Sequence, residues 1–132
     1  MLNNCAGYFP MVPFEKMTAQ DWQRVIDINL TGTFLVTQAV LPLMKDRGWG
    51  RIVNFRSGSV FDGTPGHAHY VAAKAGVVGF SRSLAREVGD YGITVNVVTP
   101  RPDGGRVFFL ASSDSAFISG QTLNIDGGMF MP

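Results

Sequence analysis

A tyrosine and a lysine stand at a spacing that could move one proton to or from a substrate oxygen. Tyr70 and Lys74 lie four residues apart, so on a helix they share one face about one turn from each other. A phenol titrates near pH ~10 and is a poor base at neutral pH, whereas an ammonium about 5 Å away favours the phenolate by roughly 3 kcal/mol. The pair therefore predicts a phenol with a lowered pKa, suited to general acid–base chemistry.

Two further polar residues accompany this pair. Ser57 precedes Tyr70 by thirteen positions and follows the apolar segment 51–55, while Asn29 lies inside an amphipathic segment. Ser59 is the competing hydroxyl, but its spacing to the tyrosine fits less well. A purely structural interpretation of Asn29 is a polar side chain satisfied at a helix irregularity, and both interpretations can hold together.

Several short motifs follow one another in a recognisable order. They are Asn4-Cys5-Ala6-Gly7, Ser57, Tyr70-Val71-Ala72-Ala73-Lys74, Thr99-Pro100 and Gly120-Gln121-Thr122-Leu123-Asn124-Ile125-Asp126-Gly127-Gly128. Together they resemble the short-chain dehydrogenase/reductase family, in the form that includes 3-oxoacyl-carrier-protein reductases and secondary-alcohol dehydrogenases. The resemblance runs along nearly the whole chain.

The resemblance implies a function for each matching position. It assigns the family's catalytic tetrad to Asn29, Ser57, Tyr70 and Lys74. Tyr70 would act as acid or base, Lys74 would support it and hold the nicotinamide ribose, Ser57 would bind the substrate oxygen, and Asn29 would hold a water that resupplies protons. Contacts to NAD or NADP are implied for Asn4, Ala6, Gly7, Tyr70, Lys74 and Pro100. The substrate would be a small-molecule carbonyl compound or secondary alcohol.

The sequence also departs from the family pattern. No glycine-rich turn of the Thr-Gly-x-x-x-Gly-x-Gly type is present, and the segment that closes over the substrate is missing after Arg101. Arg101 itself replaces a glycine, and Cys5 replaces an asparagine. Because the position that selects NAD or NADP follows the absent second strand, the cofactor type stays open. We expect impaired oxidoreductase activity, and the alternative is a non-catalytic fragment that associates with itself or with a full-length relative.

Hydrophobic periodicity and breaker residues predict alternating strands and helices. We expect strands at 1–4, 51–55, 93–98 and 121–125, helices at 19–46 (kinked at Pro42), 68–89 and 105–112, and a loop at 56–66. This order predicts a single truncated α/β domain over 1–132. By resemblance it is the C-terminal half of a Rossmann-type doubly wound parallel sheet with flanking helices, with strand 1–4 as an exposed edge.

Other side chains have simpler expected roles. Cys5 is expected to be a small buried hydrophobe. His67 and His69 are expected to be loop residues, and two histidines without a third ligand predict no metal site. For Arg56, contact with an acidic substrate group and a solvated surface charge are both open.

Composition limits the partners that we expect. The 132 residues carry a net charge of +1, with 45% apolar and 16% charged residues, which predicts a globular chain without a nucleic-acid or membrane partner. No apolar run reaches the ~18 residues of a membrane span. A single cysteine agrees with a reducing compartment, so we expect a cytoplasmic protein. Apolar and small residues on helices 19–46 and 68–89 predict a homo-oligomer formed through these helices.

Overall fold

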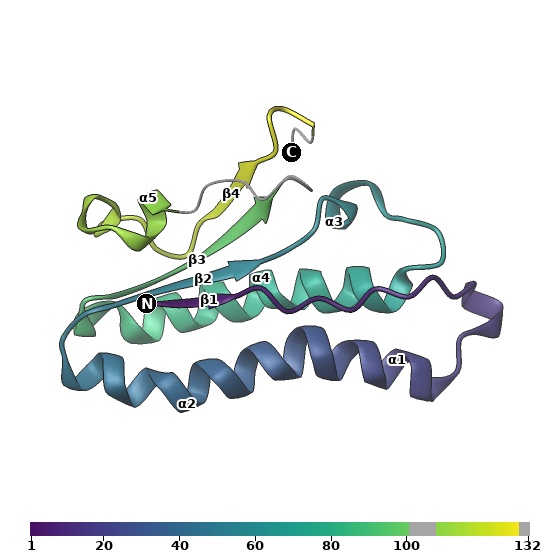
Figure 1. The fold of residues 1–132 in the computed structure, drawn as a ribbon, viewed down its shortest axis with the longest axis horizontal. Helices are drawn as coiled ribbons and strands as arrows, with labels where there is room; N and C mark the ends of the chain where they lie inside the picture. Colours follow the sequence, from purple (N-terminus) through teal and green to yellow (C-terminus); the bar gives the residue numbers. More distant parts are fainter. Residues whose placement is uncertain (101–107, 130–132) are drawn as a thin grey trace.

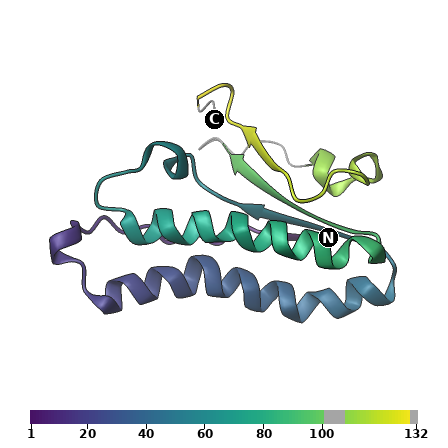
Figure 2. The same cartoon turned by 180° about the vertical axis from the view of Figure 1, so that it is seen from behind.

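The computed structural model describes residues 1–100 and 108–129, which form a parallel sheet with its main helices on one face (Figure 1). Seen from either side, the long α1–α2 helix and α4 run next to each other beneath the sheet (Figures 1 and 2). The short α5 lies across the other face. The described part of the chain is therefore α/β, as predicted.

The sheet has four parallel strands in the sequential order β1-β2-β3-β4. Their bounds are β1 (Leu2–Asn4), β2 (Gly50–Phe55), β3 (Ile93–Pro100) and β4 (Thr122–Ile125). The predicted strands are confirmed within one or two residues at each end. The two central strands are almost wholly buried, because helices cover one face and α5 covers part of the other. The first strand forms an edge of the sheet, as expected.

One continuous helix spans Ala19–Asp46, as the periodicity predicts. It consists of α1 (Ala19–Ile26), a π-helical segment η2 (Asp27–Thr31) and α2 (Gly32–Asp46), which continues through Pro42. Thr18 caps its start: its hydroxyl accepts from the Asp21 amide, and the Asp21 carboxylate accepts from the Thr18 amide. This reciprocal capping satisfies amides that have no partner within the helix. The π segment carries Asn29.

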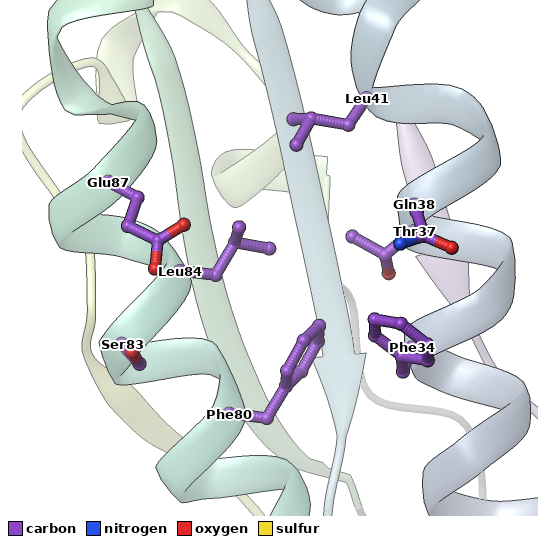
Figure 3. Close-up of a pocket in the computed structure, with 8 residues that line it drawn as sticks. All are labelled: Phe34, Thr37, Gln38, Leu41, Phe80, Ser83, Leu84 and Glu87. Carbon is purple, nitrogen blue, oxygen red and sulfur yellow. The ribbon is translucent and has the colours of Figure 1, made fainter.

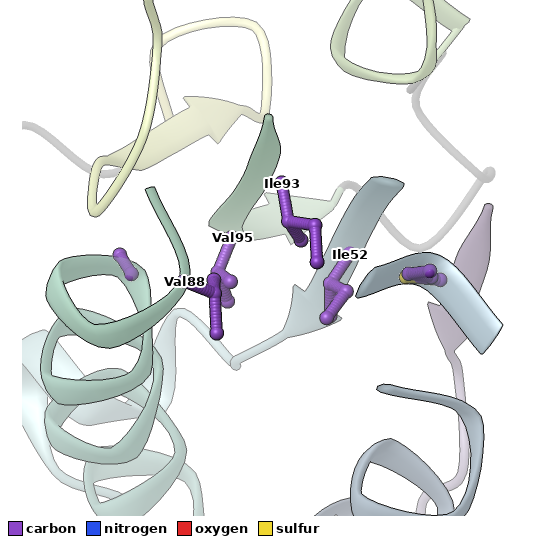
Figure 4. Packing of buried hydrophobic residues seen from close by; sticks show 6 residues of the cluster. Ile52, Val88, Ile93 and Val95 are labelled. Atoms are coloured by element: carbon purple, nitrogen blue, oxygen red, sulfur yellow. The ribbon is translucent and has the colours of Figure 1, made fainter. Parts of the chain in front are cut away.

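The second long helix, α4 (Ala68–Val88), packs against the central strands. Val88 meets Ile52, Ile93 and Val95 in the cluster that joins this helix to the sheet (Figure 4). The predicted close packing along its small residues is confirmed at Gly76, where a Cβ atom would stand 2.8 Å from a methyl group of Leu30. The helix therefore approaches the π segment closely enough to fix the two helices relative to each other.

Two short helices differ from the predicted elements. The segment expected to be a loop contains one helical turn, α3 (Ser59–Asp62), and the helix expected at 105–112 is α5 (Phe108–Ala111), with residues 105–107 outside the described part. Leu110 of α5 packs with Val53 and Val98 on the sheet face opposite α4. This second cluster is small because, within the described part of the chain, α5 is the one short α-helix on that face.

The helix Ala19–Asp46 has the length and composition of a membrane span, with a mean hydropathy of 1.3 over its most apolar window. The expectation that no segment reaches that limit is therefore wrong by this criterion. A helix that covers a sheet in a globular protein meets the same criterion, and α2 here packs against β1 and β2.

Candidate active site

A cleft of about 720 Å³ opens at the carboxyl ends of β1, β2 and β3. Its described lining combines polar residues with a few apolar ones: Cys5, Phe9, Arg56, Ser57, Gly58, Ser59, Thr64, His67, Tyr70, Pro100 and Met129. In open parallel sheets, ligands bind outside the carboxyl ends of the strands. The cleft contains Ser57 and Tyr70, which the sequence places in one site.

Lys74 is anchored beneath this cleft by two strand ends. Its Nζ donates to the carbonyl oxygens of Ala6, after β1, and of Phe55, at the end of β2, at 3.1 Å each. Only 4% of the residue is exposed, and this burial lowers the pKa of Lys74 to about 8, while Cys5 opposes the shift. Lys74 is therefore not a solvated lysine on the helix surface. The ammonium instead ties α4 to the sheet.

Tyr70 lies one helical turn before Lys74 and faces the cleft. Its ring centroid is 5.8 Å from Lys74 Nζ and 5.6 Å from the ring of Phe9. Burial raises the pKa of the phenol, and a side-chain hydrogen bond with Ser57 lowers it by a smaller amount. The predicted lowering of the Tyr70 pKa is therefore wrong for the protein by itself. Moving the phenolate out of water disfavours the charged form by more than the interaction with Ser57 favours it.

Ser57 is the serine that meets the tyrosine, in preference to Ser59. The side chain of Ser59 instead supports it: its hydroxyl donates to Ser57 Oγ at 2.9 Å, and its amide donates to the same oxygen at 3.3 Å. These contacts are possible because the chain turns into α3 directly after β2. The sequence placed Ser59 as a competitor, whereas the structure gives it a positioning role.

Asn29 is fully buried and holds the loop that follows β1. Its amide nitrogen donates to the carbonyls of Tyr8 (2.8 Å) and Val25 (2.9 Å), and its Oδ1 accepts from the Tyr8 amide at 3.2 Å. The π-helical segment is the helix irregularity considered from the sequence, so the structural interpretation of Asn29 is confirmed. A role in proton supply stays a prediction, and Asn29 is not among the residues that line the cleft.

Among the residues expected to contact a nicotinamide cofactor, Pro100 lines the cleft, whereas Asn4 and Ala6 make contacts within the fold. The Asn4 amide donates to Asn54 Oδ1 (2.8 Å) and Thr37 Oγ1 (3.1 Å), so its side chain joins β1 to β2 and α2. Ala6 contributes the carbonyl that holds Lys74, and Gly7 is exposed with open space around its Cα. Pro100 lines the cleft, and Arg101 lies outside the described residues.

Two expectations about neighbouring side chains are wrong. Cys5 is exposed and lines the cleft, because the chain leaves the sheet directly after Asn4. His67 precedes the first helical residue of α4 and is a loop residue, as expected, whereas His69 is a fully buried residue of that helix. His69 Nδ1 accepts from the Tyr70 amide at 2.9 Å, and its Nε2 has no partner among the described residues. The helix predicted at 68–89 already included this position.

For Arg56, the structure excludes one of the two alternatives left open from the sequence, the solvated surface charge. It is 92% buried rather than solvated, and its guanidinium donates to Thr99 Oγ1 at 2.6 Å and to Asn124 Oδ1 at 3.0 Å. Three strands thus meet at this side chain. Across the described residues, no group of three or more His, Cys, Asp or Glu side chains could hold a metal ion, and the expected absence of a metal stays a prediction.

Comparison with known proteins identifies the family. The short chain dehydrogenase family matches residues 1–103, which include all four tetrad positions, and the chain belongs to this family. A 3-oxoacyl-[acyl-carrier-protein] reductase of Synechocystis is 40% identical over 99% of this chain and 65% of its own length. An acetoacetyl-CoA reductase of Cupriavidus necator is 51% identical over 76% of this chain and 41% of its own length.

Solved structures agree with this assignment. A crystal structure from Agrobacterium tumefaciens, described as a gluconate dehydrogenase, superposes with a TM-score of 0.89 at 30% identity. The match covers 97% of this chain and 64% of the other. The chain thus spans about two thirds of such relatives. The predicted Rossmann-type fold and the family resemblance are confirmed.

Proposed function

We propose that this chain carries the catalytic centre of an oxidoreductase that moves a hydride between NAD or NADP and a carbonyl compound or secondary alcohol. The observation that carries the proposal is that Tyr70 and Ser57 line one cleft at the carboxyl ends of parallel strands, one helical turn from the buried Lys74. A phenol and a hydroxyl in one cleft can bind one substrate oxygen together. Family membership supports the same reaction class.

The residues of the chain fit one side of a nicotinamide cofactor. Tyr70 and Lys74 offer a hydroxyl and an ammonium for ribose hydroxyls, and Pro100 provides an apolar wall near the cleft mouth. The bound cofactor would accept or supply the hydride. The residues do not fit the pyrophosphate of the cofactor. The sequence contains no glycine-rich turn before a helix, and in the first turn of α1 the Asp21 amide already donates to Thr18.

Ser57, Tyr70 and Lys74 have different roles in the proposed proton transfer. Ser57 donates to or accepts from the substrate oxygen, and Ser59 holds it in place. Tyr70 exchanges the proton with that oxygen, and its raised pKa keeps it protonated and ready as an acid in the reducing direction. Lys74 has a pKa of about 8, so its charge can change close to neutral pH.

Replacement of the tyrosine tests this proposal. In a full-length form, or one complemented with a cofactor-binding N-terminal half, Tyr70→Phe should lower turnover by at least ~100-fold, which is typical of lost general acid–base catalysis. Steady-state turnover of an alcohol or ketone with either nicotinamide measures the effect. Tyr91→Phe is the control, since Tyr91 is 45% exposed and lies outside the cleft. Near-normal turnover of Tyr70→Phe would contradict the proposal.

A second candidate function is association without catalysis, and one surface favours it. A groove of about 350 Å³ between α2 and α4 is lined by one buried residue, Thr37, and by exposed or half-buried ones: Phe34, Gln38, Leu41, Phe80, Ser83, Leu84 and Glu87 (Figure 3). The Phe34 and Phe80 rings meet edge to face at 6.4 Å, and Phe34 is 41% exposed. We propose that a second copy of this chain, or a full-length relative, covers this groove.

The cellular setting also remains a proposal. A cytoplasmic location, with neither a nucleic-acid nor a membrane partner, is supported by the net charge of +1 and by the single cysteine. The apolar helix Ala19–Asp46 makes the membrane part of this proposal the one to test first. Flotation of the purified chain with anionic and neutral vesicles would measure it, and recovery with either vesicle would contradict it.

A further inference from the structure

Arg56 is a buried cation in the wall of the cleft, next in sequence to Ser57. Its two hydrogen bonds, to Thr99 Oγ1 and Asn124 Oδ1, go to neutral oxygens. These bonds use only part of the donor fork of a guanidinium. Within the described residues these hydrogen bonds go to neutral oxygens, and the buried carboxylate of Asp126 is the acidic neighbour of Arg56, so this 92% buried guanidinium keeps further N–H donors for a partner.

The guanidinium is held rigidly at this place. The ring of Phe61 from α3 lies 3.7 Å from its central carbon, and the hydrogen bonds fix it to the ends of β3 and β4. Burial and the nearby Arg82 lower the pKa of Arg56, whereas Asp126 raises it. The charge is thus already removed from water before any ligand arrives, which strengthens its attraction for an anion.

The surroundings in the cleft favour a negative ligand. Among the described lining residues none is an aspartate or glutamate, while Arg56 and His67 both line it and Lys74 lies behind Tyr70. Arg56 lies on the same cleft wall as Ser57, whose hydroxyl contacts the reacting phenol. A group bound to Arg56 would therefore lie close to the oxygen that the serine and tyrosine bind.

We propose that Arg56 is a specificity-determining residue, which binds a carboxylate on a substrate whose carbonyl or hydroxyl carbon lies within a few bonds of it. The preferred substrate class is then an oxo acid or hydroxy acid. The inference rests on the proposed function, because it assumes that the cleft is the substrate site. A planar carboxylate matches the planar donor fork of arginine, which explains why an arginine, rather than a lysine, suits this position.

Ligand binding to the chain itself tests the assignment without cofactor or turnover. Acetoacetate and its neutral methyl ester are titrated separately and followed by saturation-transfer NMR. We expect acetoacetate to bind at least about tenfold more tightly than the ester, the range of a charge-assisted hydrogen bond. Arg56→Gln should abolish the difference, while Arg86→Gln, at an exposed arginine on α4, should preserve it. Arg56→Lys should retain part of it.

The possible outcomes separate this inference from the proposed function. Equal binding of the two probes, binding of neither, or an unchanged preference in Arg56→Gln would each overturn the role of Arg56. Circular dichroism verifies that the variants are folded, and Arg56→Lys supplies the comparison if Arg56→Gln does not fold. The Tyr70→Phe turnover experiment is independent of these results, since it depends on proton transfer and not on a carboxylate.

Discussion

The cleft and the groove between α2 and α4 differ in how far their side chains find partners among the described residues. In the cleft, Lys74 has two carbonyl partners, Ser57 has Ser59, and Arg56 has Thr99 and Asn124. In the groove, large apolar side chains such as Phe34 and Leu84 meet solvent, and no element among the described residues covers them (Figure 3). The contrast indicates that the residues proposed for proton transfer have partners within the chain, whereas the described residues supply no apolar cover for the groove.

The largest expected effect concerns cofactor binding, because the sequence lacks the glycine-rich turn that holds the pyrophosphate. We predict that these 132 residues bind NADH or NADPH at least about a thousandfold more weakly than full-length relatives and show no measurable turnover. A glycine-rich turn at a helix N-terminus supplies the pyrophosphate contacts in such folds, and each ~1.4 kcal/mol lost is tenfold in affinity. Calorimetric titration of the purified chain measures this. Micromolar binding of either cofactor would contradict it.

Next in size is the effect of the buried lysine on stability. The pKa of Lys74 is about 8 in the folded chain and 10.5 as a free side chain, so the unfolded state binds more protons between these pH values. Stability should rise with pH through this window. Lys74→Met lacks this titrating group, so its stability should not rise in this way. The free energy of unfolding of Lys74→Met minus that of the wild type should therefore fall between pH 8 and 10.5, by at most about 3 kcal/mol.

Urea unfolding of both proteins across this pH range measures the difference. Taking the difference between the two cancels other groups that titrate alike in both proteins. Lys16→Met is a matched control, because Lys16 is exposed, and it should leave the pH dependence unchanged. A stability difference between Lys74→Met and the wild type that is constant from pH 8 to 10.5 would show that burial does not lower the pKa of Lys74.

The smallest effect is expected at the groove. We predict that the folded chain is a dimer or larger, and that Phe34→Glu shifts it towards monomer by about 2 kcal/mol of association free energy. This is the usual value of one buried large apolar side chain. Light scattering at micromolar concentration measures the mass. Phe14→Glu is the control, because Phe14 is 75% exposed outside the groove. A wild-type monomer would contradict the prediction.

Local patterns predicted most of the architecture. The capping residues Thr18 and Asp21, the helical periodicity beyond them and the β-branched run at Ile93–Pro100 each specify an element through neighbours in sequence. Spacing also brought Tyr70, Lys74 and Ser57 into one hypothesis, since helix geometry and strand order fix their relative positions. The short α3 was missed because four helical residues leave no periodic signal.

The errors arose where the environment of a side chain depends on distant segments. The pKa of Tyr70 is raised because burial, which spacing alone does not reveal, outweighs the contact with Ser57. Arg56 was open between substrate contact and solvent, and only the joint approach of Thr99, Asn124 and Phe61 buries it. Cys5 was assigned to the interior on composition, whereas the edge position of β1 exposes it.

The sequence by itself therefore determined the elements, their parallel order and the residues able to exchange a proton, because these follow from contacts within a few residues and from the chain direction. Only the tertiary structure decided which charges are buried, which carbonyls hold Lys74 and which apolar faces stay uncovered. These properties depend on desolvation and on pairs such as Lys74 and Ala6, separated by 68 positions along the chain. Such pairs are set by how the sheet and helices assemble.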